Sequence, residues 1–300
     1  MSYYTTGCNV WYTNGIKSKI NDKINYRMKK LIILIFVVSA MFFGGKQVFA
    51  QSSNPTPVFD FQKAYQDFVF NFDKYRSNHD EYELARSQYL QSQTLAAQAK
   101  AQEATYNMLF ARDEAVRSYL TMLRTRLGEA VGVSVDRRDF LFTKIATEVN
   151  WFTSHQSRLS SASSLEDQVS DSNEAKAQYD KATEVLIYDV LTEIALGKQY
   201  FLRQKQITII SDLESKLDQI RSDGQIDTGQ IERWLLETKN LVIRSEGKEQ
   251  DALKLQTENA KSKNRSSLFN QIQFRVNESI QYLKDANDFL LETIKTIRNS

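Results

Sequence analysis

The sequence predicts an all-α protein, an elongated antiparallel helical bundle or coiled coil with two long helices and two shorter ones. Pro55 and Pro57 are the only prolines and the chain has 10 glycines, so it is poor in the turn residues that strands and hairpins need. Strong helix formers such as Ala, Leu, Glu and Lys are abundant. Apolar residues also recur at alternating spacings of three and four, which is typical of helices with one buried face.

The N-terminal segment predicts export. Met28 is followed by two lysines, an apolar run covers residues 31–43, and Val-Phe-Ala ends at Ala50; this is the order of a secretory signal peptide, which we place at residues 28–50. Residues 1–27 show no clear period, and we interpret them as a non-structural leader from a misassigned start. The alternative is an uncleaved membrane anchor over residues 31–45, although its apolar run is shorter than the ~20 residues that span a bilayer.

Charge and cysteine content exclude several classes of function. The first fifty residues carry seven basic side chains and one acidic one, so a chain with net charge +2 has −4 over residues 51–300. A mildly acidic body with mixed signs argues against nucleic acid as a partner. The one cysteine, Cys8, precedes the signal segment, so the mature chain is predicted to have no disulfide, thiol nucleophile or thiolate metal site.

Residues 51–57 are predicted to be a polar linker and residues 58–300 the helical bundle domain. The first helix is expected over about 58–127, because an apolar stripe begins in it and returns near its end after a stretch of small residues. The opening stripe consists of Phe61, Tyr65, Phe68, Phe72, Tyr75, His79 and Tyr82.

The second and third helices are predicted from caps. Asp136 is expected to cap a helix that runs to about Ser160. After a polar loop, Asp171 and Glu174 have the spacing of a capping box, and the third helix then runs to about 221. Its two apolar stripes are out of phase near Gly197, which predicts a kink or phase slip there.

The fourth helix is predicted from Asp227 to about Asn299. Its polar middle, residues 245–267, is either a weakly packed helix or a break, and Asn287 is placed in its apolar stripe. Because short connections make consecutive helices antiparallel, the expected order is up, down, up, down.

Recognisable catalytic motifs are missing, so we expect no enzyme, no catalytic residue and no cofactor. The only histidines, His79 and His155, fall on apolar stripes. With Glu83 and Glu148 they form a weak candidate metal site, and we expect no metal there. We expect instead that polar residues on the stripes set the helix register, namely His79, Asp113, His155 and Asn287.

Phe59 and Phe70 lie on the face opposite the first aromatic stripe, so one helix partner cannot bury both sets. They are the candidate partner-binding residues. A second packed helix, an exposed spot for self-association, and a sugar or membrane-surface contact remain open interpretations.

These features predict an exported, non-enzymatic coiled-coil protein with a structural or interaction role in the cell envelope or extracellular space. The expected partner is a protein or a second copy, with no nucleic acid and with membrane contact only through a retained N-terminal segment. The alternatives are a helical bundle that binds a metal or small ligand, and a membrane-tethered coiled coil.

Overall fold

The computed structural model describes residues 60–223 and 228–299. The chain divides into two units, Met1–Pro57 and Val58–Ser300, and the described residues belong to the second. The predicted leader, signal peptide and linker, and also Phe59, lie outside the described residues.

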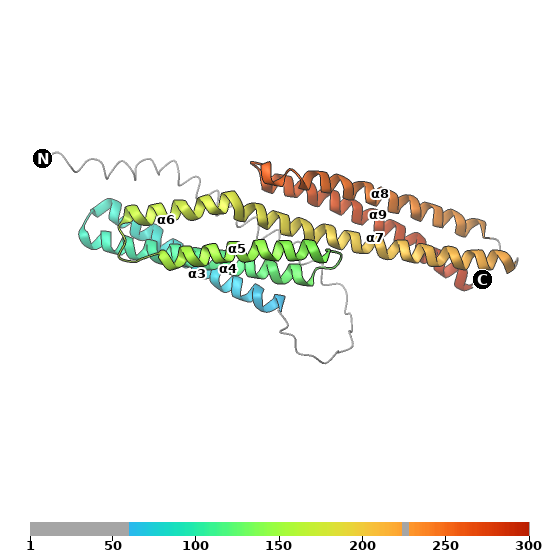
Figure 1. Cartoon of the computed structure of the whole chain (residues 1–300), viewed down its shortest axis with the longest axis horizontal. Helices are drawn as coiled ribbons and strands as arrows, with labels where there is room; N and C mark the ends of the chain where they lie inside the picture. The colour runs from blue at the N-terminus through green and yellow to red at the C-terminus, as the bar shows by residue number, and fades with distance from the viewer. Residues whose placement is uncertain (1–59, 224–227, 300) are drawn as a thin grey trace. The chain divides into compact units, whose positions relative to one another are not determined.

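Every regular element in the described residues is helical, which confirms the all-α prediction (Figure 1). The elements, in chain order, are the helices α3 (Phe61–Ser92), α4 (Leu95–Glu129), α5 (Val135–Arg158), α6 (Leu165–Gln178), the π-helix η1 (Tyr179–Thr183), α7 (Glu184–Asp223), α8 (Gly229–Gln256), the 3₁₀-helix η2 (Asn259–Lys261) and α9 (Arg265–Asn299).

The expected single helix over 58–127 is wrong, because the chain turns back between α3 and α4. Gln93 ends α3 in the left-handed conformation (φ 50°), and its N–H donates to the Tyr89 carbonyl at 2.9 Å. The Thr94 hydroxyl then caps α4 by accepting from Ala97 N–H. The predicted aromatic stripe faces α4: Phe68 and Tyr75 are buried, and the Phe68 ring lies 5.0 Å from that of Tyr119.

Two predicted caps are also wrong. Ser134, rather than Asp136, caps α5, and Asp136 lies in the first turn. The capping box at the start of α6 is formed by Ser164 and Asp167. Asp171 and Glu174 therefore lie inside α6, where their side chains are available for contacts with other helices.

The predicted irregularity at Gly197 lies elsewhere, because α7 is continuous through this residue and the π-helix η1 precedes it. Gly197 instead permits a close backbone approach by the loop between α4 and α5. A Cβ on Gly132 (φ +76°) would lie 1.9 Å from the Gly197 carbonyl oxygen, and one on Gly197 would lie 2.8 Å from that of Val131. Only glycine fits this contact.

The predicted fourth helix is two helices, α8 and α9, which pair with each other and with α7 (Figure 1). Its polar middle is thus a break, located at residues 257–264. The apolar core of this group includes Ile231, Leu235, Leu283 and Leu290. Asn287 is exposed, and the fully buried Ala286 takes the expected stripe position. The expected up-down-up-down arrangement of four helices is therefore replaced by a longer series.

We refer below to α3–α6 as the N-terminal region and to α7–α9 as the C-terminal region. In the N-terminal region α4 is the shared helix, since it packs against α3, α5 and α6. In the C-terminal region α7, α8 and α9 all contact one another. The candidate site lies where α4, α5 and α6 meet.

Candidate functional site

A buried histidine links three helices of the N-terminal region. His155 on α5 is 1% exposed, and Asp113 on α4 is fully buried. The His155 Nδ1 lies 2.5 Å from Asp113 Oδ2, and its Nε2 lies 3.1 Å from the backbone carbonyl oxygen of Asp171 on α6. Since a carbonyl oxygen can only accept, Nε2 donates this second hydrogen bond.

The walls of the site are aromatic and cationic. The Trp151 ring stacks on the imidazole, with centroids 5.1 Å apart and an interplanar angle of 11°. Arg112 Nε lies 3.5 Å from Asp113 Oδ1, and Arg112 Nη1 donates to the Ser172 hydroxyl at 3.1 Å. Arg112 thus compensates the buried carboxylate and ties α4 to α6.

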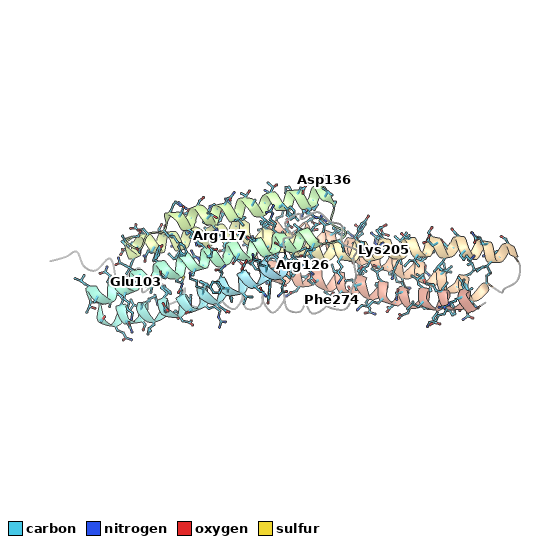
Figure 2. All side chains as sticks on the ribbon, turned by 90° about the horizontal axis from the view of Figure 1, so that it is seen from below. Glu103, Arg117, Arg126, Asp136, Lys205 and Phe274 are labelled. Carbon is cyan, nitrogen blue, oxygen red and sulfur yellow. The ribbon has the colours of Figure 1, made fainter. Side chains whose placement is uncertain are left out.

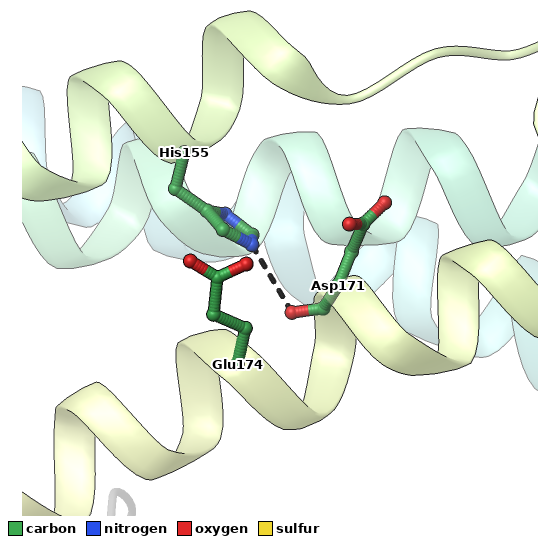
Figure 3. Close-up of side chains that lie close together, drawn as sticks. All are labelled: His155, Asp171 and Glu174. Atoms are coloured by element: carbon green, nitrogen blue, oxygen red, sulfur yellow. Dashed lines mark hydrogen bonds between the residues drawn. The ribbon is translucent and has the colours of Figure 1, made fainter.

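Two carboxylates of α6 complete the site. Asp171 and Glu174 are three residues apart and therefore share a helix face. Figure 3 shows the Glu174 carboxylate beside the imidazole. One potential ligand atom from each of His155, Asp171 and Glu174 lies within 4.8 Å of the other two. These three residues could hold a cation.

Arg158 competes for the outer carboxylate. Its Nη2 donates to Glu174 Oε1 at 2.7 Å, and this hydrogen bond raises the pKa of Arg158. The Arg158 and Glu174 side chains are 59% and 44% exposed, so solvent screens the pair. The buried end of the site is therefore fixed, whereas its outer end is accessible and easily rearranged.

The other members of the predicted metal site have different partners. Glu148 on α5 is buried and accepts hydrogen bonds from the Thr183 hydroxyl at 2.6 Å and from Gln178 Nε2 at 3.0 Å. Thr183 is the last residue of η1, so the π-helix presents this hydroxyl to Glu148. His155, by contrast, is held by Asp113 and Asp171.

His79 contacts residues of its own helix. Its Nε2 lies 3.9 Å from Glu83 Oε1, and its ring lies 5.9 Å from Tyr75 and 6.0 Å from Tyr82. Of the four predicted candidates, the structure records contact only between His79 and Glu83. Asp171 and Glu174 join His155 instead; their i, i+3 spacing was visible in the sequence, but it indicated a cap.

A second buried polar cluster lies in the C-terminal region and was missed by sequence reasoning. Gln199 Nε2 donates to the hydroxyls of Ser279 at 2.8 Å and Ser245 at 3.2 Å, and all three residues are fully buried. Nearby, Arg203 Nε donates to Glu249 Oε2 at 3.0 Å. The available signal was the polar residues within the apolar stripes of α7–α9.

The surface has a shallow groove of about 540 Å³ between α8 and α9. Phe274, labelled in Figure 2, contributes to its lining and is 60% exposed. The other residues that line this groove are mostly polar, and they do not combine a nucleophile with a base and a group that orients it.

Within the described residues, no helix combines the length and apolarity needed to cross a membrane. Comparisons with protein-family models, with curated proteins and with solved structures find no match to this chain. Function must therefore be argued from the residues and their contacts.

Proposed function

We propose that this chain is an exported, non-enzymatic helical protein that acts by coiled-coil-type contacts with a protein partner or a second copy. The observation that carries the proposal is the regular exposure of large apolar side chains. On α8, Leu236 and Ile243 are 61% and 65% exposed, and on α3, Phe70 and Leu84 are 70% and 57% exposed. Both pairs are separated by whole heptads, so each pair lies on one helix face.

Two further observations support the proposal. The polar side chains buried at the two helix junctions bond mainly to each other, as expected of groups that align helices. The order of residues 28–50 supports export. A place in the cell envelope or extracellular space follows from that order.

The contact function is tested by association measurements. Sedimentation velocity over a wide concentration range, alone and with captured partners, would be compared for wild type, Leu236→Glu/Ile243→Glu and Phe70→Glu/Leu84→Glu. A carboxylate placed in a buried apolar contact is costly, so one double variant should abolish association while the other serves as its matched control. Association that is unchanged in both variants contradicts the proposal.

Export is tested separately by N-terminal sequencing of the secreted or envelope-bound chain. The expected first residue is Gln51. A chain that retains residues 31–45 would support the membrane-tethered alternative, and a chain found only in the cytoplasm would refute export.

A further inference from the structure

We propose that His155, Asp171 and Glu174 form a binding site for a divalent transition-metal cation such as Zn²⁺, at the junction of α5 and α6. The inference goes beyond the contact function and does not depend on it. It begins from the two sides of the imidazole ring.

Both nitrogens of His155 face oxygen acceptors. Asp113 takes the Nδ1 side at 2.5 Å, and the Asp171 carbonyl oxygen faces Nε2 at 3.1 Å. If Nδ1 supplies the only ring proton, the Nε2 lone pair points at a carbonyl lone pair. Something positive must then lie between them, either a second proton or a metal ion.

The surroundings favour a metal ion over a proton alone. A histidine that binds a metal usually donates its other N–H to a carboxylate, which fixes the ring and raises its basicity as a ligand. The buried Asp113 supplies that carboxylate. Asp171 and Glu174 add two anionic oxygens near the opposite nitrogen, more negative charge than one proton requires.

The remaining rearrangement is small and lies at the exposed end. In Figure 3 the Asp171 carboxylate is turned away from the ring and has to rotate toward it. Glu174 has to leave Arg158, an exposed ion pair worth about 0–1 kcal/mol. A bound cation exceeds that cost easily, since structural Zn²⁺ sites contribute on the order of 10 kcal/mol.

The ligand types select the class of metal. One imidazole nitrogen with two carboxylates suits Zn²⁺ and its first-row neighbours. Mg²⁺ strongly prefers oxygen ligands and retained waters. The site should therefore distinguish Zn²⁺ from Mg²⁺.

The test is calorimetric titration of the chelator-stripped full chain with Zn²⁺ and, separately, with Mg²⁺. We expect one Zn²⁺ per chain and at least tenfold weaker binding of Mg²⁺. Glu174→Gln should weaken Zn²⁺ binding at least tenfold, whereas Arg158→Gln should strengthen it several-fold by releasing Glu174. The matched controls are Glu166→Gln, an exposed carboxylate of α6, and His79→Gln, and both should bind as wild type does.

Circular dichroism would check that each variant is folded, and ¹⁵N NMR of the His79→Gln protein would observe His155 alone. Loss of the Nε2 proton upon Zn²⁺ addition supports the proposal. It is overturned if wild type binds no Zn²⁺, if Glu174→Gln and Arg158→Gln leave the affinity unchanged, or if His155 keeps both ring protons in excess Zn²⁺.

Discussion

The two regions of this protein join their helices with different chemistry. In the N-terminal region the most buried polar contact is the Asp113–His155 pair, which bridges α4 and α5. In the C-terminal region the most buried contacts are neutral, from Gln199 to Ser245 and Ser279, and the ion pair Arg203–Glu249 is 9% exposed on each side. Since an unpaired buried charge costs far more than a lost neutral hydrogen bond, the two junctions should respond differently to mutation.

The largest expected effect is at Asp113. Asp113→Ala leaves His155 without its charge partner and opens a gap between α4 and α5, so we expect the free energy of unfolding to fall by about 3–5 kcal/mol. Urea denaturation followed by circular dichroism measures this loss. A loss below about 1 kcal/mol would show that the charged junction is no more sensitive than the neutral one.

The next effect concerns the close backbone contact of Gly132 with Gly197. Gly132→Ala requires a left-handed conformation and places Cβ against the Gly197 carbonyl, so we expect destabilisation of about 2–4 kcal/mol. Gly247→Ala on α8 is the matched control, because nothing lies within 4 Å of its Cβ position. This control should gain about 0.5–1 kcal/mol. Similar thermal midpoints for the two variants would contradict the contact.

A smaller effect is expected in the neutral cluster. Ser279→Ala removes one hydroxyl from a group in which Ser245 can still accept from Gln199, so unfolding should become easier by about 1 kcal/mol. The same urea titrations apply. A loss as large as that of Asp113→Ala would remove the distinction between the two junctions.

The smallest effect, with opposite sign, is at Tyr119 on α4. Its hydroxyl is buried without a hydrogen-bond partner, and burial raises its pKa well above the usual value. Tyr119→Phe removes an unsatisfied polar atom while keeping the ring beside Phe68. We expect stability to be unchanged or higher by up to about 1 kcal/mol, measured by differential scanning calorimetry; clear destabilisation would indicate that the hydroxyl is satisfied.

Sequence periodicity predicted the helical class and the aromatic face of α3, because these depend on the spacing of large apolar residues. It missed the turn at Gln93–Thr94, where a glutamine takes the left-handed conformation that glycine usually supplies. It also placed Asn287 inside instead of Ala286. Both positions fit alternating three- and four-residue spacings, and only the close packing of α8 on α9 selects the smaller side chain.

The candidate site was predicted in part. Asp113 and His155 were both placed on inward faces, and the structure brings them together. Their pairing could not be derived, because it depends on which helices are adjacent, and the missed turn changed that order. Asp171 and Glu174 were recognised as a pair but given a local role, since a capping box and a shared helix face have the same spacing.

The π-helix between α6 and α7 has a consequence for how the long helical segment serves both regions. A π-turn contains one residue more than an α-turn, so it rotates every following side chain about the helix axis. Shortening residues 179–183 by one would remove that offset. The face of α7 that now meets α8 and α9 would be turned by roughly 100°, so a single inserted position coordinates the orientations of two otherwise separate sets of contacts.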